Sequence, residues 1–129
     1  MKTPPEAVPR KWAWHYRALL RLGHTLASES GERSAAIREA PDRGGADGAD
    51  GANDEAEHES MLAEIRHEQA ELTEIDAALD RIRHGTYGVC QSTGSLIEPE
   101  RLRAVPWTRF SLGAARQLER SAAKPRSAL

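Results

Sequence analysis

The sequence lacks the residues that build disulfides and thiolate metal sites, because its 129 residues include a single cysteine. One cysteine excludes an intramolecular disulfide and a zinc site made of thiolates alone. Aromatic residues are also scarce, at 5%, and hydrophobic residues make up 39% of the chain while charged residues reach 29%. This composition is lean for a compact globule of this size and is typical of a long, solvated helical hairpin.

Long apolar runs are absent as well. No stretch approaches the roughly 18 apolar residues of a membrane-spanning helix, and the first residues, MKTPPEAVPRK, lead into no signal-peptide core. We therefore expect a cytoplasmic protein without a membrane segment. We find no nucleophile–base pair or phosphate-binding loop and expect no enzyme. We also expect no basic stripe with interleaved aromatic residues, and hence no direct binding to DNA.

The net charge of −2 conceals an uneven distribution. Residues 42–60 hold seven acidic side chains against one arginine, whereas residues 101–129 hold seven basic side chains against one glutamate. Such a separation orients a molecule on a charged partner more than it stabilises a fold.

Two segments have the periodicity of long helices. After a proline-containing tail, residues 1–10, apolar residues follow a 4-3 spacing that Gly23, Ser30 and Arg33 interrupt, until Pro41 ends the pattern. These apolar residues are Trp12, Tyr16, Leu19, Leu26 and Ile37. The second segment, from about Asn53 to Arg83, alternates steps of three and four through His58, Met61, Ile65, Glu68, Leu72, Ile75, Leu79 and Ile82. That pattern predicts a coiled-coil seam with one polar interruption.

Two such helices most simply pair antiparallel, as a coiled-coil hairpin over residues 11–84 with its tip at 41–53. The alternative is two unrelated amphipathic helices on a globule. We favour the hairpin because the residues outside each seam are mostly charged or small, so no second apolar face remains.

From Gly85 the sequence becomes rich in turn residues, and we expect a compact globular region over residues 85–124. A small β-hairpin is expected around Tyr87–Val89 and Ser95–Ile97, and helical spacing resumes through Phe110, Ala114 and Leu118. Residues 125–129 form a tail. The expected fold is therefore mostly α, with a hairpin, a small knuckle and a C-terminal helix.

The run YGVCQSTG, residues 87–94, has the frame of a zinc knuckle, with Thr93 in the place of the second cysteine. Together with ALDRIRHG before it and RLRAVP after it, this run resembles the DksA/TraR family of RNA polymerase-binding transcription factors. In zinc-bearing members four cysteines form two pairs, and the resemblance places those positions at Cys90, Thr93, Ser111 and Ala114. Because one ligand of four remains, we expect a zinc-free variant with a degenerate zinc finger and no metal.

Packing should replace the metal. We expect a small core made of Tyr87, Val89, Leu96, Ile97, Leu102, Val105, Trp107, Phe110 and Leu112. Cys90 is then a small buried residue, with a redox or nucleophilic thiol as the alternative.

At the hairpin tip, family members that act on polymerase resemble one another in the pattern Asp-x-x-Asp-x-Ala. Here Asp47, Asp50 and Ala52 match it, and Asp50 lies 40 residues before Cys90, the separation that the resemblance implies. Two alternatives exist for these aspartates: a solvated linker, and a calcium site. The calcium site lacks the alternating acidic frame of an EF-hand loop.

The resemblance implies that the hairpin enters the secondary channel of bacterial RNA polymerase and modulates transcription initiation as a monomer. It also implies a link to the stringent response, because well-studied members act with ppGpp through three basic positions. Those positions here are Glu74, Val105 and Ala115, so we expect weak or absent ppGpp synergy. Four arginines remain as candidate contacts to the polymerase rim or ppGpp: Arg101, Arg103, Arg109 and Arg116. The competing function is a coiled-coil adaptor without polymerase activity.

Overall fold

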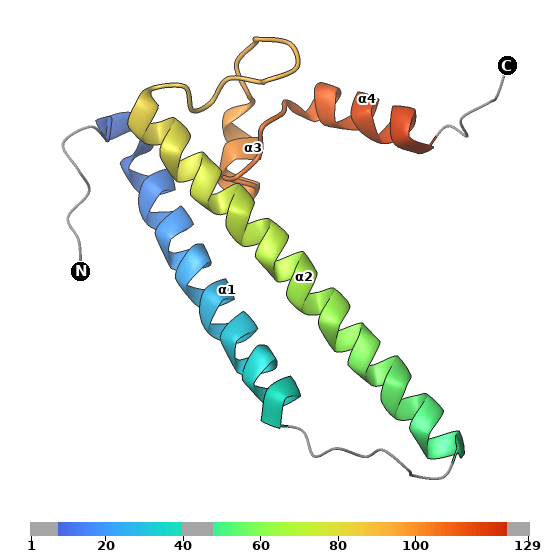
Figure 1. The fold of residues 1–129 in the computed structure, drawn as a ribbon. Coiled ribbons are helices and arrows are strands. Elements are labelled where there is room, and N and C mark those ends of the chain that lie inside the picture. Colours follow the sequence, from blue (N-terminus) through green and yellow to red (C-terminus); the bar gives the residue numbers. More distant parts are fainter. Residues whose placement is uncertain (1–7, 40–47, 124–129) are drawn as a thin grey trace, which may run out of the picture. The chain divides into compact units, whose positions relative to one another are not determined.

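The computed structural model describes residues 8–39 and 48–123, and the side chains of residues 8–38 and 53–123. A short 3-10 helix, Arg10–Trp12, precedes α1 (Ala13–Glu39), α2 (Gly48–His84), α3 (Pro99–Ala104) and α4 (Leu112–Ala123). The two long helices, α1 and α2, run in opposite directions and form a helical hairpin (Figure 1). The predicted fold class is therefore confirmed. Within the described ranges no helix combines the length and the apolarity needed to cross a bilayer.

The chain divides into two compact units. We call Arg21–Thr73 the arm, and we call Met1–Leu20 together with Glu74–Leu129 the base. The base thus joins the beginning of α1 to the end of α2 and to everything that follows. Because the two segments are far apart in sequence, only tertiary contacts hold the base together.

The arm is built on a thin seam. Ile65 and Glu68 of α2 are buried, whereas His58 is exposed and so does not extend the seam to its expected beginning. Arg33 of α1 forms an ion pair with Glu68 and a second one with Glu64 at 3.2 Å. Arg33 and Glu68 both stand at seam positions in the sequence. The polar residue that interrupts the seam of α1 therefore pairs with the polar residue that interrupts the seam of α2.

The helix α1 runs without a break, and α2 begins earlier than the sequence pattern suggests. The helix α1 continues through Ser28–Gly31, where Ser30 is buried. The helix α2 begins at Gly48, five residues before the expected start at Asn53. Acidic residues near a helix N-terminus interact favourably with its dipole, and alanines at 49 and 52 favour helix, which offsets the two glycines. Part of the expected tip, residues 48–53, is therefore helical.

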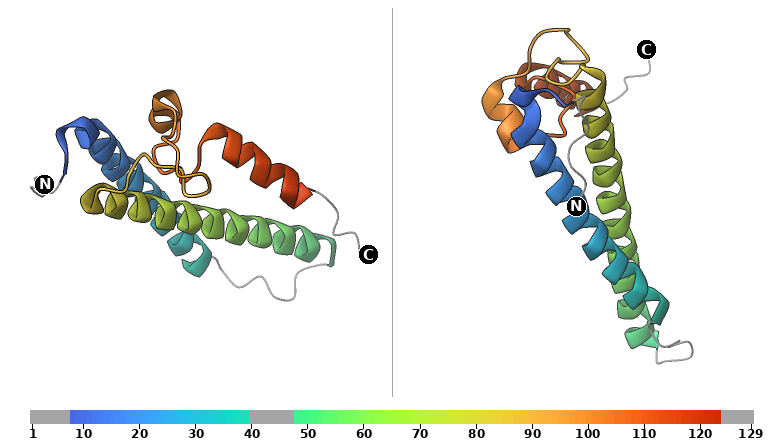
Figure 2. Two further views of the ribbon diagram at one scale, coloured as in Figure 1. Left: turned by 90° about the horizontal axis from the view of Figure 1, so that it is seen from above. Right: turned by 90° about the vertical axis from the view of Figure 1, so that its left-hand side faces the viewer.

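The core of the base gathers apolar side chains from both ends of the chain. In Figure 2 the start of α1 lies near the end of α2 and near α3. Leu19, Ile75, Ile82 and Cys90 are the largest fully buried side chains. Of the seam residues predicted for this part of the hairpin, Trp12 is half-buried. The others are buried, as expected: Tyr16, Leu19, Ile75, Leu79 and Ile82.

Trp12 connects the start of the chain to the turn after α2. Its ring packs edge to face on Tyr87 with centroids 4.8 Å apart, and a Cβ at Gly88 would lie 2.9 Å from its Cζ2 atom. Gly88 also has φ 86, a conformation that costs a side-chain-bearing residue free energy. Glycine is therefore needed at this position both for the backbone and for the space.

The expected core of the knuckle is only partly correct. Tyr87, Ile97 and Leu102 are buried, and Val105, Trp107 and Phe110 are half-buried. Val89, Leu96 and Leu112, in contrast, are exposed by 38%, 80% and 40%.

The backbone explains two of these three errors. Val89 and Leu96 form an isolated antiparallel bridge, which confirms the expected pairing of these two segments. Successive side chains of extended backbone point to opposite faces. Cys90 and Ile97 take the inner face, so Val89 and Leu96 take the outer one.

Candidate functional site

The turn that carries Cys90 has the closed geometry of a zinc knuckle. The N–H of Gly94 donates to the carbonyl oxygen of Cys90 at 2.8 Å, and the N–H of Cys90 donates to the carbonyl oxygen of Ser95 at 2.7 Å. Gly94 has φ 74, which lets the chain reverse after the position of the second ligand. The loop is therefore closed by its own backbone hydrogen bonds.

Three of the four degenerate ligand positions meet at the sulfur of Cys90. Burial raises the pKa of the Cys90 thiol. Hydrogen bonds from the hydroxyls and backbone N–H groups of Thr93 and Ser111 lower it by more, so that the pKa is about 6. Ser111 precedes α4, and its Oγ accepts a hydrogen bond from the N–H of Ala114 at 3.3 Å. The Ser111 hydroxyl thus satisfies a free N–H at the start of the helix and also donates to the thiol.

These side chains do not make a zinc site. Structural zinc takes four thiolate, imidazole or carboxylate ligands, whereas this set offers one thiol, two hydroxyls and the buried methyl group of Ala114. Among the described residues no group of three or more His, Cys, Asp or Glu side chains is placed to hold a metal. His84 is exposed, and its Nδ1 lies 2.7 Å from the carbonyl oxygen of Asp80.

The start of α4 receives a second polar contact from outside the helix. The Oε1 atom of Glu98 accepts a hydrogen bond from the N–H of Leu112 at 3.1 Å. Backbone N–H groups, its own and that of Leu112, lower the pKa of the Glu98 carboxyl. Glu98 and Ser111 therefore satisfy N–H groups that the first turn of any helix leaves free.

The four arginine candidates differ in what their guanidinium groups contact. Arg101 donates to the carbonyl oxygen of Phe110 at 2.8 Å and to Thr108 Oγ1 at 3.3 Å. Arg109 forms an ion pair with Glu74 at 2.6 Å and a hydrogen bond to Gln91 at 3.3 Å. Both residues therefore hold the knuckle together.

The other two arginines point outward. Arg103 lies over the ring of Trp14, 4.8 Å from its centroid. Arg116 is exposed on α4. These two guanidinium groups are more available to a partner than those of Arg101 and Arg109.

The resemblance places basic ppGpp contacts at three positions, and none of the three holds a basic residue here. Glu74 is the half-buried partner of Arg109, and Val105 and Ala115 are half-buried. At Glu74 the position carries a charge of the opposite sign, and that charge is already paired.

The tip residues are less completely placed. Asp47 lies outside the described residues, and Asp50 and Ala52 lie in the first turns of α2 in the part whose side chains are not described. Their assignment as polymerase contacts stays a prediction.

Sequence reasoning missed two groups of residues that organise the knuckle. Arg81 donates from its Nη2 to the carbonyl oxygens of Trp107 and Thr108 at 3.2 and 3.4 Å. The sequence pattern marked Arg81 only as one more charged residue on a helix surface. His15 packs between Trp12 and Trp14 at the start of α1. The signal for the second group was the density of aromatic rings in WAWHY, which a seam alone does not require.

Comparison with known proteins agrees with this geometry. Residues 85–120 match the prokaryotic dksA/traR C4-type zinc finger. The chain is 32% identical over 111 residues to General stress protein 16O of Bacillus subtilis, covering 81% of this chain and 66% of that protein. It is 36% identical over 75 residues to the RNA polymerase-binding transcription factor DksA of Caulobacter vibrioides, covering 58% of this chain and 53% of that one.

A third relative, an uncharacterized protein of Aquifex aeolicus, is 49% identical over 53 residues, which cover 41% of this chain and 37% of that protein. The chain thus spans between 37% and 66% of the length of these three relatives. The structure of transcription factor DksA2 from Pseudomonas aeruginosa has the same fold, with a TM-score of 0.76 and 26% identity over 96% of this chain and 95% of that one. The hairpin, the knuckle and these matches agree: the chain belongs to the DksA/TraR family.

Proposed function

We propose that this protein binds bacterial RNA polymerase and regulates transcription initiation without binding DNA. In this proposal the tip of the α1–α2 hairpin enters the secondary channel, through which nucleotides reach the active centre. The observation that carries the proposal is the fold shared with transcription factor DksA2 over nearly the whole chain. A long hairpin that ends in an acidic tip is suited to reaching into a narrow channel.

Asp47, Asp50 and Ala52 are the residues that we assign to the tip contact. The assignment rests on the Asp-x-x-Asp-x-Ala pattern and on the distance in sequence between Asp50 and Cys90. Substituting Asp50→Asn removes the charge and keeps the shape. We expect unchanged binding to purified polymerase and a lost effect on transcription from a ribosomal promoter. An interaction adaptor without polymerase activity would show no change in either assay.

We further propose that the knuckle works without zinc. The hydroxyls and N–H groups of Thr93 and Ser111 surround the Cys90 sulfur where a metal would otherwise bind, and backbone hydrogen bonds close the loop. Measuring the zinc content of the purified protein by atomic emission tests this directly. A stoichiometric content of zinc would refute it.

For the alarmone, we propose that ppGpp does not act through the position of Glu74. The carboxylate there is paired with Arg109, and a polyanion placed beside it would be repelled. Transcription from a ribosomal promoter, measured with and without ppGpp, should show little synergy. A matched variant, Glu74→Lys, places a basic side chain at this position. If this variant shows no increase in ppGpp synergy, the position has no influence on the effect of ppGpp.

We also propose a cytoplasmic monomer that acts by binding and catalyses no reaction. The ion pair between Arg33 and Glu68 satisfies the polar seam positions inside one chain, which favours an intramolecular hairpin over a zipper between two chains. Sedimentation equilibrium should therefore give the mass of one chain, and a dimer mass would favour the adaptor function.

A further inference from the structure

The outer face of the first helical turns carries basic side chains around one exposed tryptophan. Arg10, Lys11 and Arg17 are exposed, and Trp14 is exposed by 38%. Trp14 and Arg17 are three residues apart in α1 and share one side of that helix. Arg10 and Lys11 belong to the preceding 3-10 helix, where Lys11 Nζ lies 5.3 Å from the centroid of the Trp12 ring. Arg103 of α3 adds its guanidinium over the Trp14 ring. We call the four cations and Trp14 the basic–aromatic face, and all of them belong to the base.

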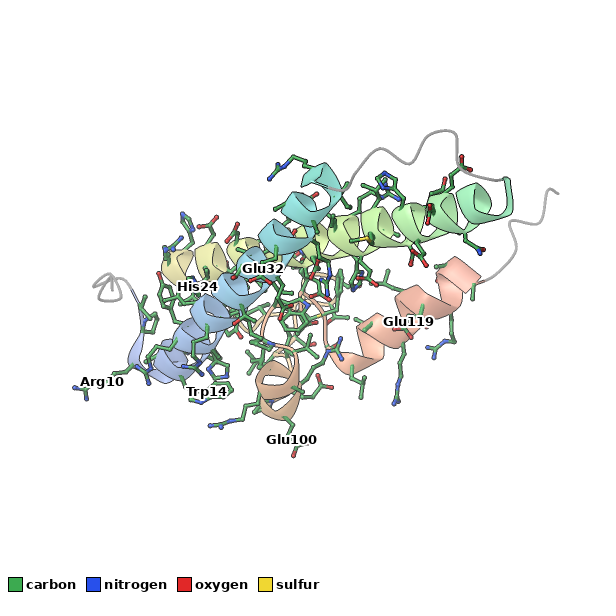
Figure 3. All side chains as sticks on the ribbon, turned by 90° about the horizontal axis from the view of Figure 1, so that it is seen from below. Arg10, Trp14, His24, Glu32, Glu100 and Glu119 are labelled. Atoms are coloured by element: carbon green, nitrogen blue, oxygen red, sulfur yellow. The ribbon has the colours of Figure 1, made fainter. Side chains whose placement is uncertain are left out.

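The aromatic residues of WAWHY divide between the interior and this face. Tyr16 and His15 are buried, and Trp12 packs on Tyr87, so Trp14 is the ring that remains toward solvent. Figure 3 shows Trp14 at the side of α1 next to α3, with Arg10 extending from the segment before it. One exposed ring among these cations is not a stripe with interleaved aromatics, and the expectation that the chain does not bind DNA stays a prediction.

Two neighbours fix the Trp14 ring from different directions. The His15 ring meets it edge to face with centroids 5.0 Å apart, and Arg103 covers it at 4.8 Å. Burial lowers the pKa of His15, and the nearby charge of Arg103 lowers it further. An anchor whose rotamer is already fixed loses little conformational entropy on binding.

The charge of the face is one-sided. Between Val8 and Ser28 the sequence contains no aspartate or glutamate. In the described part of the chain no ion pair involves Arg10, Lys11, Arg17 or Arg103. On α3, the carboxylate of Glu98 is bound to α4, and Glu100 projects outward from that helix (Figure 3). Among the residues that the structure describes, these four cations have no ion-pair partner.

We propose that the basic–aromatic face binds an acidic, aromatic- or leucine-bearing segment of a protein partner. Tryptophan and arginine are the side chains that most often dominate the binding energy of protein interfaces, and unpaired cations around them select for acidic residues. The face lies on the 3-10 helix, α1 and α3 and belongs to the base, whereas the expected tip residues belong to the arm, so the proposal does not require entry into the polymerase channel.

Nucleic acid fits this face less well. A base that stacks on tryptophan needs a free ring face, and Arg103 already lies against the ring. One exposed ring with a single cation over it also differs from the series of stacking platforms that single-stranded binding uses. An acidic peptide needs neither a free ring face nor a series of rings. Its carboxylates pair with the guanidinium groups, and one apolar side chain packs beside Trp14.

The test uses fluorescence anisotropy with two labelled probes, a short acidic peptide with a central phenylalanine and a DNA duplex of matched charge. The full chain is compared with Arg17→Glu, Arg103→Ala and the control Arg66→Glu, an exposed arginine of the arm. We expect the peptide to bind the wild type and the control equally, and to bind both face variants about tenfold more weakly. Emission of the protein's tryptophans should change on addition of peptide, and Trp14→Phe should reduce that change.

Three outcomes would overturn the proposal: no binding of the peptide, an equal loss in the control, or tighter binding of DNA with loss in the same face variants. The last outcome would make this face a nucleic-acid site. Far-UV circular dichroism checks that each variant keeps its helical content, and because Arg17 is exposed, its substitution leaves the core of the base intact. None of these measurements includes polymerase, so failure here is distinct from failure of the proposed function.

Discussion

The base and the arm are held together in different ways. In the base, four fully buried side chains, edge-to-face rings and arginine–carbonyl hydrogen bonds join segments that are far apart in sequence. In the arm, the described interior consists of a thin seam in which Arg33 pairs with the buried Glu68. The base therefore depends on many separate packing and hydrogen-bond contacts, whereas the arm depends on the match between two polar positions.

This difference suggests where each unit tolerates change. In a unit with many independent contacts, one substitution removes only a small part of the stability, except where close packing leaves no room for added atoms. A unit with a narrow seam is sensitive to any unpaired charge left inside it. Four substitutions test these statements, in order of decreasing expected effect.

Gly88→Ala should be the most destabilising. Its Cβ would lie 2.9 Å from Trp12 Cζ2, and the backbone has φ 86. Steric overlap and backbone strain together should cost about 2–4 kcal/mol of unfolding free energy, measured by urea denaturation. Gly94→Ala is the matched control, because it shares a positive φ of 74 but has nothing within 4 Å. That control should cost about 1–2 kcal/mol, and equal losses in the two variants would show that the contact with Trp12 is unimportant.

Arg33→Met should destabilise the arm more than the double substitution Arg33→Met with Glu68→Leu. The single change leaves the Glu68 carboxylate buried without its partner, while the double change leaves an apolar seam. Hydrogen exchange of the amides in α2 between 60 and 73 should be fastest in the single variant and should return toward wild type in the double variant. Arg66→Met, at an exposed position, serves as control. A double variant less protected than the single one would contradict this account of the seam.

The Cys90 thiol gives the base a dependence on pH. Its pKa is about 6 in the fold, below the ordinary 9.0 of a thiol, so folding favours the thiolate. The stability that follows is fully present above pH 9 and is lost as the pH falls through about 6. Thiolate absorbance should therefore titrate near pH 6, and Thr93→Val should move the midpoint upward.

The same linkage predicts a difference in stability between variants. The gap in unfolding free energy between wild type and Cys90→Ala should widen as the pH rises from about 6 toward 9. Ser92→Ala, an exposed hydroxyl in the same turn, is the control and should leave the titration unchanged. A titration midpoint near 9 in the wild type would mean that the hydrogen bonds from Thr93 and Ser111 do not stabilise the thiolate.

The ion pair between Glu74 and Arg109 should matter least for stability. Its side chains are 38% and 31% exposed, and pairs of this kind contribute less than about 1 kcal/mol. Glu74→Gln should lower the unfolding free energy by less than that and should be indistinguishable from wild type at high salt. A loss of several kcal/mol would place this pair among the main supports of the knuckle.

Much of the fold was predictable because it depends on periodicity. The 4-3 spacing of Ile75, Leu79 and Ile82 correctly identified the buried side of α2, and the glycines at 85, 88 and 94 marked the turns. The candidate site was partly predictable, because the frame around Cys90 is a local motif. Its neighbours in space were harder, since nothing in the sequence states that the Ser111 hydroxyl donates to the thiol while accepting from α4.

The errors have the same origin. Val89 and Leu96 look like core residues by composition, and only the pairing of two extended segments decides which of their faces is inside. Arg101 and Arg109 look like free cations, and only the fold shows that carbonyl oxygens and Glu74 occupy their donors.

The sequence by itself determined the two long helices, the polar positions in their seams and the presence of a single thiol in the knuckle, because these features follow from residue type and local spacing. The tertiary structure alone decided that Trp12 and Tyr16 turn inward while Trp14 meets Arg103, and that Thr93 and Ser111 meet Cys90. The physical reason is that hydrogen bonds and ring contacts act over a few ångströms. Residues distant in sequence gain such contacts only after apolar burial has brought their segments together.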